Sequence, residues 1–370
     1  METTRMNPST DVIVEERGRT GLITLNRPRA LNALSLDMVR TLTATLLDWA
    51  QAERIEAVAI RGMGKDGPFS AFCAGGDIRF FHQAAVSGDA RIEDFFTEEY
   101  TLNHLVHRFP KPYVVFMDGI VMGGGMGIAG HGSAQALRLA TSSTRMAMPE
   151  TNIGLFPDVG GGWFLARCPG ALGEYLALTG EVIGAEDARH AGLADGVLAV
   201  DALPAAWERL AEGGAAAVAA LRGEASQAAA TGASLAASRA SIDRCFSLPD
   251  VPAIVGALEA AEDDWARKTA ATLRKRSPLM LHVVLEQLRR ARGMSLAEDL
   301  RMERGMVRRC FERGDGGHSE TVEGIRALAI DKDHAPRWQP DRIEAVDAAL
   351  VARFFDSPWP AHAHPLRGLD

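Results

Sequence analysis

Short apolar segments alternate with helix-patterned ones over the first 200 residues, and this order restricts the chain to a few fold classes. Residues 12–26 (VIVEERGRTGLITLN) give two strand-like segments around a glycine-containing turn. Residues 35–53 follow with Ser35 as an N-cap, and their apolar side chains share one helical face: Leu36, Val39, Leu42, Leu46 and Trp49. Further strands are predicted at 57–62, 113–119 and 136–141, with helices at about 88–108 and opening around 163–168. The repeated strand, strand, helix order predicts an α/β core over residues 11–200.

The chain changes character beyond about residue 200. An alanine-rich stretch is predicted to be helical, with interruptions at Gly213, Gly214, Gly223 and Gly232. Residues 277–293 (SPLMLHVVLEQLRRARG) have the pattern of an amphipathic helix, with Pro278 in the first turn and Gly293 past the end. We therefore expect a helical C-terminal region over residues 205–370.

The composition excludes several kinds of protein. The 370 residues carry a formal net charge of −8, which disfavours nucleic acid as a partner. No apolar run approaches the roughly 20 residues of a membrane-spanning helix, so no membrane partner is expected. The opening residues lack the features of a signal or transit peptide, and we expect a cytoplasmic protein. Few lysines beside abundant alanine and glycine favour a bacterial source.

The spacing of the four cysteines argues against disulfides and against a zinc site. They are widely spaced and form no Cys-x-x-Cys pair: Cys73, Cys168, Cys245 and Cys310. This spacing predicts free thiols rather than a disulfide framework or a zinc site, and we expect no metal.

Two carboxylates stand in a run that otherwise has the composition of a buried segment. Residues 146–163 (MAMPETNIGLFPDVGGGW) contain only two charged side chains, Glu150 and Asp158. A buried carboxylate without a partner is costly and has a raised pKa. The pair is therefore either bonded to distant arginines or kept for chemistry.

A glycine-rich loop follows one predicted strand and allows a first interpretation. Residues 123–130 (GGGMGIAG) match a dinucleotide-binding pattern at Gly125, Gly127 and Gly130, with Glu150 standing 20 residues further on. The strand predicted at 136–141 intervenes before Glu150, which disfavours this interpretation.

A second glycine loop suggests the alternative. Residues 71–77 (AFCAGGD) also follow a predicted strand. If Gly76 and Gly124 each point an N–H group at one ligand oxygen, they form an oxyanion hole. Either loop by itself could be only a tight turn.

Four motifs decide between these interpretations, because they occur in order and at suitable spacing. They are LNRPRALNALSLDMV (25–39), AFCAGGDIRFF (71–81), DGIVMGGGMGIAGHG (118–132) and ALTGEVIGAEDARHAGLAD (177–195). Together they resemble the enoyl-CoA hydratase/isomerase (crotonase) superfamily. The resemblance implies a crotonase-like spiral of ββα units, an acyl-CoA ligand, and a thioester carbonyl held by the amides of Gly76 and Gly124.

Further motifs resemble the subgroup of this superfamily that hydrolyses 3-hydroxyisobutyryl-CoA, a step of valine breakdown. They are EEYTLNHLV (98–106), KPYVVFMDGIVMGGGMG (111–127), MPETNIGLFPDVGGGWFLAR (148–167) and EGIRALAIDKDHAPRWQP (323–340). The last lies in the helical region, so the resemblance covers nearly the whole chain. Hydratases carry a second Glu shortly after the triple glycine, where this chain has Gly127.

The resemblance implies roles for the two carboxylates. It places Glu150 beside the thioester carbonyl, where it can attack to form a mixed anhydride or act as general base toward water. We favour attack. Asp158 stands where a hydratase has glycine, and it could orient water or protonate the departing thiolate.

Other positions follow from the same resemblance. Glu99 matches an acyl-pocket residue that would contact the substrate hydroxyl or Glu150, although the adjacent Glu98 can be confused with it. The CoA contacts correspond to Arg29, Ala30, Ala74, Asp77 and Ile78. His131 is expected to be a buried structural residue rather than a base.

Three functions remain open at this point. The chain is a hydrolase of a short branched 3-hydroxyacyl-CoA, an isomerase or hydratase using Glu150 alone, or a non-catalytic acyl-CoA-binding protein. The intact pair of Glu150 and Asp158 favours the hydrolase. In that case CoA is part of the substrate and no further cofactor is expected, and a homo-oligomer is possible.

Overall fold

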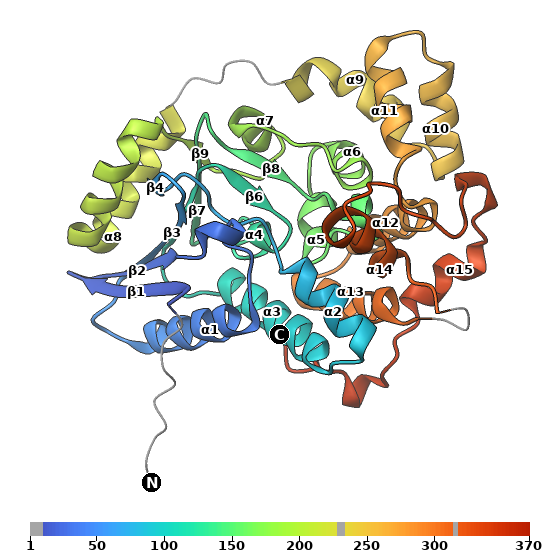
Figure 1. Ribbon diagram of the computed structural model, residues 1–370. Coiled ribbons are helices and arrows are strands. Elements are labelled where there is room, and N and C mark those ends of the chain that lie inside the picture. Colours follow the sequence, from blue (N-terminus) through green and yellow to red (C-terminus); the bar gives the residue numbers. More distant parts are fainter. Residues whose placement is uncertain (1–9, 228–233, 314–316) are drawn as a thin grey trace.

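The computed structural model describes residues 10–227, 234–313 and 317–370 (Figure 1). Within these ranges a seven-stranded sheet has the order β1 (Val12–Arg17), β2 (Thr20–Leu25), β3 (Ala57–Gly64), β5 (Tyr113–Met117), β7 (Ala136–Ala140) and β9 (Gly196–Val197), with β4 (Gly67–Pro68) on β3. The β1–β2 hairpin is antiparallel, and the strands from β2 to β9 along this order run parallel. A second, parallel pair consists of β6 (Ile120–Met122) and β8 (Arg145–Ala147).

Helices cover both faces of the main sheet, which Figure 1 shows with α8 (Leu203–Gln227) on one side and α1 (Leu36–Gln51) and α3 (Arg91–His107) on the other. Trp207 of α8 packs with Leu22 and Phe116, whereas Ile23 and Val115 belong to the larger core that includes α1 and α3. Neighbouring strand residues thus point to opposite, equally buried faces. This explains continuous apolar runs such as YVVFM, because parallel strands covered on both sides need them.

Further helices surround the second strand pair and form the C-terminal region. Those of the first 200 residues are α2 (Ile78–Ser87), α4 (Gly124–Gly127), α5 (Gly161–Leu165), α6 (Leu172–Thr179) and α7 (Ala185–His190). The later ones are α9 (Ser234–Phe246), α10 (Val251–Ala260), α11 (Asp264–Leu273), α12 (Pro278–Ala291), α13 (Leu296–Phe311), α14 (Glu320–Ile325) and α15 (Ala348–Ala352). No helix in the described ranges is both long and apolar enough to cross a membrane.

The α/β class with a helical C-terminal region is confirmed, together with several local predictions. The Ser35 side chain accepts a hydrogen bond from the Met38 N–H (3.3 Å) and caps α1. The helix predicted at 277–293 is α12, and Ser277 caps it ahead of Pro278. All four cysteines lie in the described ranges, where they are free and buried. The division near residue 200 remains a prediction, and α8 packs on the sheet of the first region.

Other local predictions were wrong. Helix α2 was not predicted, and the helix expected to open around 163–168 is the single turn α5, which ends at Leu165. Of the glycines expected to interrupt the alanine-rich helix, only Gly214 has non-helical angles (φ 53°, ψ −141°) within α8, and Gly223 lies inside the helix. Gly232 lies outside the described residues.

Asn32 connects the first helical turn to the loop that carries Gly76. It has a φ of 56°, in the left-handed region that asparagine tolerates. Its side-chain NH2 group lies within hydrogen-bond distance of three carbonyl oxygens, those of Met63, Ala71 and Phe72 (2.9–3.0 Å). Its side-chain oxygen accepts from the Arg27 N–H at 2.8 Å. One buried amide therefore fixes where residues 71–76 leave the sheet.

We expect Asn32→Ala to destabilise the protein by roughly 2–4 kcal/mol, because it strips buried carbonyls of their donor. Urea unfolding followed by circular dichroism gives the measurement. Asn26→Ala is the control, since its side-chain amide donates to the Thr10 carbonyl (3.0 Å) in an exposed hydrogen bond. A midpoint for Asn32→Ala equal to that of the control would contradict the assigned role.

Candidate active site

A cavity of about 180 Å³ collects most of the residues singled out from the sequence. It lies between the loop after β4, the loop after β6, helix α3, and the 149–158 segment after β8. The residues that line it are Ala74, Gly75, Gly76, Ile78, Phe81, Glu99, Gly123, Gly124, Pro149, Glu150, Asn152, Ile153, Leu155, Asp158 and Leu328. Both predicted carboxylates, both predicted amide donors and Glu99 are therefore in one place.

The two glycine loops approach each other because the chain after β3 pairs with β6. Cys73 and Val121 form a parallel bridge, and the Cys73 N–H donates to the Ile120 carbonyl at 2.9 Å. A Cβ added to Gly124 would lie 3.4 Å from the Gly76 nitrogen, and one added to Gly75 would lie 3.4 Å from the Gly124 nitrogen. Glycine at these positions leaves both nitrogens open to the cavity.

Both amides are available for a ligand. Among the described residues, neither the Gly76 nor the Gly124 N–H donates to an acceptor within the protein. The neighbouring Asp77 N–H is already bonded to the Leu34 carbonyl (3.1 Å). Because α4 is a single turn, its helix dipole is small. The N–H groups themselves must therefore supply most of the attraction for a ligand oxygen. Two such donors facing one cavity can stabilise an oxyanion.

Glu150 begins a 3₁₀ turn (Glu150–Ile153) that follows β8. It is 6 % exposed, and its Oε1 lies 2.7 Å from the position that a Cβ on Gly123 would take. Its Oε2 has no hydrogen-bond partner in the described part of the chain. The carboxylate is therefore held against the glycine loop with one oxygen uncommitted.

Glu99 and Glu98 lie on different faces of the amphipathic helix α3. Glu99 lies on the buried face, and its Oε1 is 2.6 Å from the position of a Cβ on Gly124. That oxygen has no partner among the described residues. Glu98 points outward and pairs with Arg40 (2.7 Å). The apolar stripe through Phe95 and Glu99 could have resolved this ambiguity from the sequence.

Asp158 is bonded to a residue that the sequence reasoning missed. The Tyr100 hydroxyl donates to Asp158 Oδ2 at 3.0 Å, and both side chains are buried. Tyr100 follows Glu99 on α3, so one helix supplies both the Glu99 carboxyl group and the hydroxyl that donates to Asp158. A buried tyrosine within the EEYTLN motif was the available signal.

Burial shifts the titration of all three carboxyl groups in one direction. Burial, and then the charge of Asp158, raises the pKa of Glu150 well above its usual range. The pKa of Glu99 rises for the same reason, with Asp158 and Glu150 adding repulsion. Burial raises the pKa of Asp158 to about 7, against the lowering effect of the Tyr100 hydrogen bond. The cluster therefore retains protons near neutral pH and can both donate and accept them.

Gly127, the position where hydratases carry a second Glu, has no room for a side chain. A Cβ there would lie 2.7 Å from Val159 Cβ and 2.8 Å from Asn103 Nδ2. Val159 follows Asp158 directly. The turn that supplies Asp158 therefore occupies the space that a second Glu would need. The dinucleotide-binding interpretation, which the sequence already disfavoured, is also unsupported by the structure, because Glu150 faces this cavity rather than ending a neighbouring strand of the sheet.

The residues predicted to contact CoA gather at one corner of the site. Ala74 and Ile78 line the cavity, and the Ala74 N–H donates to the Leu31 carbonyl (3.0 Å) beside the 3₁₀ turn Pro28–Ala30. Arg29 of that turn is exposed. The Asp77 carboxylate caps α2 and pairs with Arg27 (2.9 Å), and its backbone N–H and carbonyl are bonded to Leu34 and Phe81 (3.1 Å each). Their contact with CoA remains a prediction.

The C-terminal region also contributes to the cavity. Thr321 of α14 donates to the Gly154 carbonyl at 2.6 Å and so holds α14 against the Glu150 turn. The chain then continues as a turn of π-helix, Arg326–Ile330, that brings Leu328 to the cavity wall. The motif at 323–340 includes Leu328, but the sequence gave no partner for it, because it is far along the chain from Glu150 and the glycine loops.

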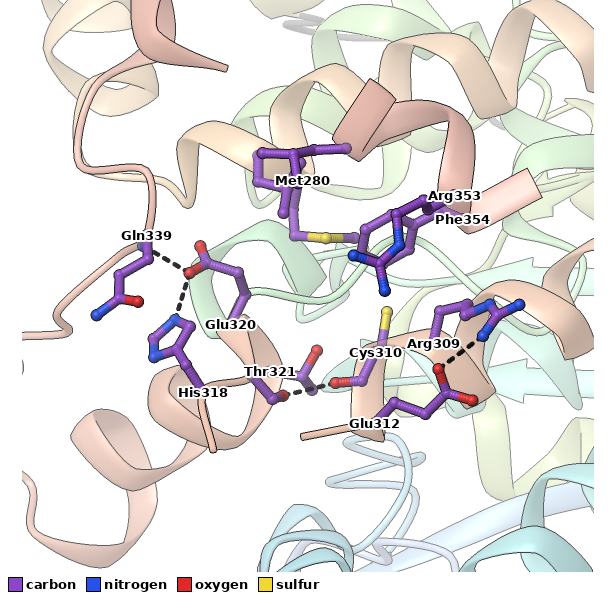
Figure 2. A pocket seen from close by; sticks show the side chains of 13 residues that line it. Met280, Arg309, Cys310, Glu312, His318, Glu320, Thr321, Gln339, Arg353 and Phe354 are labelled. Atoms are coloured by element: carbon purple, nitrogen blue, oxygen red, sulfur yellow. Dashed lines mark hydrogen bonds and ion pairs between the residues drawn. The ribbon is translucent and has the colours of Figure 1, made fainter. Parts of the chain in front are cut away.

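A second cavity, of about 210 Å³, lies among α12, α13 and α14 (Figure 2). Glu320 at its wall accepts hydrogen bonds from His318 Nε2 (2.8 Å) and the Gln339 N–H (2.7 Å), and Ser277 donates to its other oxygen. Burial raises the pKa of the nearby Cys310 thiol far above its usual range. This cavity thus offers neither an uncommitted Glu320 carboxylate nor a reactive thiol. Glu320 connects α14 to the segments that contain Ser277 and Gln339 through its hydrogen bonds.

Comparison with known proteins identifies the class of protein to which this fold belongs. Residues 20–355 match the enoyl-CoA hydratase/isomerase family, and the chain belongs to this family. It is 39 % identical over 354 residues to the mitochondrial 3-hydroxyisobutyryl-CoA hydrolase of Danio rerio, covering 94 % of this chain and 90 % of that protein. The human protein of the same name is 38 % identical, with 95 % and 91 % covered.

Solved structures confirm the crotonase fold over nearly the whole chain. A carnitinyl-CoA dehydratase from Mycobacterium thermoresistibile has a TM-score of 0.86 at 37 % identity, covering 95 % of this chain and 98 % of that one. An enoyl-CoA hydratase from Rhodobacter sphaeroides 2.4.1 has a TM-score of 0.81 at 38 % identity, with 94 % and 98 % covered. The helical C-terminal region is therefore part of the shared architecture.

We expect Gly124→Val to abolish activity, because its side chain would enter the space between Glu99 and the Gly76 N–H. Thiol release from an acyl-CoA substrate is the measurement. Gly256→Val in α10 is the matched control, since a Cβ there meets nothing within 4 Å. A folded Gly124→Val protein with the kinetics of the control would remove this loop from the site.

Proposed function

We propose that the protein hydrolyses the CoA thioester of a short branched 3-hydroxy acid, with 3-hydroxyisobutyryl-CoA as substrate. The observation that carries this proposal is the placement of Glu150 and Asp158 in one buried cavity with two uncommitted glycine N–H groups. Full-length similarity to relatives named 3-hydroxyisobutyryl-CoA hydrolase supports the choice of substrate. The chain is an acyl-CoA thioester hydrolase in this proposal, and its place would be in valine breakdown.

The first step forms an acyl-enzyme. The thioester oxygen accepts hydrogen bonds from the Gly76 and Gly124 N–H groups, which stabilise the charge that develops on it. The Glu150 carboxylate attacks the carbonyl carbon, and the C–S bond breaks to give a mixed anhydride. Asp158 in its protonated form gives its proton to the departing sulfur, so free CoA thiol leaves. The step needs the charge on Glu150 and the proton on Asp158. Because burial and the charge of Asp158 favour a proton on Glu150, that proton must pass to Asp158 before the attack, within a pair that titrates as a unit.

The second step consumes water. The Asp158 carboxylate, still bonded to the Tyr100 hydroxyl, takes a proton from a water molecule as that water attacks the anhydride. The acid leaves, Glu150 is again a carboxylate, and Asp158 is again protonated. Glu99, whose Oε1 is buried and uncommitted, is suitably placed to bind the 3-hydroxyl group.

An isomerase or hydratase using Glu150 alone is the competing function, and two solved relatives carry names of that kind. The packing of Val159 against Gly127 leaves no room for the second Glu of a two-Glu hydratase. An enzyme that uses Glu150 alone is disfavoured by Asp158, which would have no part in that chemistry. The proposal needs no cofactor apart from the CoA of the substrate. A cytoplasmic location and a homo-oligomer remain predictions, and the vertebrate relatives are named as mitochondrial.

Glu150→Gln should retain the fold and CoA binding but lose on the order of 10²- to 10⁴-fold in kcat, because an amide neither attacks nor accepts a proton. Thiol release measures the rate, and CoA titration measures binding. Glu98→Gln, on the outer face of α3, is the control and should keep wild-type turnover. More than about a tenth of wild-type kcat in Glu150→Gln would exclude Glu150 from the mechanism.

Asp158→Gly should slow thioester hydrolysis at least 10²-fold while CoA affinity changes less than about tenfold, because only transition-state interactions are lost. Asp158→Asn, which can still accept the Tyr100 hydrogen bond but carries no acidic proton, should show the same loss. In ¹⁸O-labelled water, label in the Glu150 carboxylate would identify the anhydride and contradict the general-base role.

Substrate conversion without thiol release decides against the proposal. Double-bond migration or hydration at a rate unchanged by Asp158→Gly would favour the isomerase alternative. A wild-type protein that binds acyl-CoA without any conversion would favour the non-catalytic one.

A further inference from the structure

The turn that carries Asp158 has an uncommon backbone conformation. Val159 has a φ of 55°, in the left-handed region that β-branched residues rarely adopt, and Gly160 follows with a φ of 85°. The Val159 side chain is buried and packs against Gly127. Such a conformation persists only where surrounding contacts determine it.

Two side chains of the C-terminal region bond the backbone on both sides of Asp158. Gln287 of α12 donates from Nε2 to the Pro157 carbonyl at 2.8 Å. Glu303 of α13 accepts from the Gly160 N–H at 2.7 Å and from the Gly162 N–H at 3.0 Å. Gln287 Nε2 also lies 3.0 Å from Glu303 Oε1, which joins the two side chains.

Residues of the core complete the enclosure from the opposite side. His131 Nε2 lies 2.7 Å from the Val159 carbonyl oxygen, and burial lowers the pKa of His131 to about 3. The neutral ring therefore donates this hydrogen bond, as expected for a structural histidine. With the Tyr100 hydroxyl on the Asp158 carboxylate, consecutive groups from residue 157 to residue 160 are held.

We propose that Gln287 and Glu303 are positioning residues that fix the direction of the Asp158 carboxylate. Neither lines the catalytic cavity, so both act through the turn that they bond. This inference rests on the proposed catalytic role of Asp158. It gives α12 and α13 a part in the reaction.

We call Gln287 and Glu303 together the clamp. Its polar chemistry favours a role in positioning Asp158 over a role in packing alone. Gln287 and Glu303 are both 0 % exposed, and a buried carboxylate costs much more than an apolar side chain of the same volume. A second buried acid of α13, Asp299, accepts from the next N–H along the chain, that of Trp163 (2.9 Å). Directional bonds to consecutive backbone groups fix one geometry of the turn, which apolar contacts would leave less defined.

The test compares Glu303→Gln and Gln287→Met with wild type in the full-length chain. Each variant removes part of the clamp, and a carboxylate displaced by about an ångström loses on the order of 10- to 100-fold in kcat. We expect that fall in kcat with KM changed less than about twofold, because acyl-CoA contacts are untouched. Adding Glu303→Gln to an Asp158→Asn protein should give no further fall, since the clamp then has nothing to aim.

Asp187→Asn is the matched control. Asp187 of α7 is also a buried carboxylate that accepts a backbone N–H, from Leu235 at 2.9 Å, but it lies outside the cavity lining. It should keep wild-type kcat at a temperature where every variant is folded by circular dichroism. If Glu303→Gln does not fold, Gln287→Met carries the test.

Three results would overturn the inference. They are an unchanged kcat in both clamp variants, an equal fall in Asp187→Asn, or a full further fall in the Asp158→Asn background. Failure of the proposed function is distinguishable, because the wild-type protein would then release no thiol at all.

Discussion

The site depends on the close approach of two backbone loops that have no side chains to separate them. The chain after β3 pairs with β6 through Cys73 and Val121, and this pairing brings the Gly76 and Gly124 nitrogens to the same cavity. A Cβ on Gly125 would lie 2.4 Å from the Cys73 carbonyl oxygen, so the pairing itself requires glycine. The triple glycine thus serves two ends, because it permits the approach of the strands and leaves amides without side chains in front of them.

Three carboxyl groups in one apolar cavity have a cost that the fold must offset. Each has a folded-state pKa raised above its unfolded value, chiefly by burial. The folded state therefore binds more protons than the unfolded state between the ordinary carboxyl range, about 4, and the raised values, which for Asp158 is about 7. Stability from this cluster is accordingly present at low pH and declines as the pH rises through that window. At and above neutral pH the cluster lowers the stability of the folded protein, which is typical of carboxyl groups arranged for proton transfer.

Much of the site could be predicted from the sequence because its signals are local. Glu150 and Asp158 stand out in an uncharged run, and the glycine loops follow recognisable strands. The partners of Tyr100, Asn32 and the Gln287–Glu303 pair could not be found in this way. The Tyr100–Asp158 bond spans 58 residues, and Glu303 reaches Gly160 across 143 residues. Such contacts exist only once the sheet and helices have packed, and a polar residue on a helical stripe does not name its partner.

Contacts of this kind also cross the predicted division near residue 200, which follows a change in sequence composition rather than the arrangement of the site. The short strands β6 and β8 and the single-turn α4 and α5 have too few residues to give a period of their own, and they form where neighbouring segments hold them. The turn at Asp158 is the extreme case. The Gly161 N–H donates to the Asp158 carbonyl (2.7 Å), but the Pro157 carbonyl and the Gly160 and Gly162 N–H groups are bonded by side chains of α12 and α13. Without these helices the Pro157 carbonyl and the Gly160 N–H would lose their present hydrogen-bond partners. Asp158 thus belongs by sequence to the predicted α/β core, although the backbone on both sides of it is bonded by side chains of the C-terminal region.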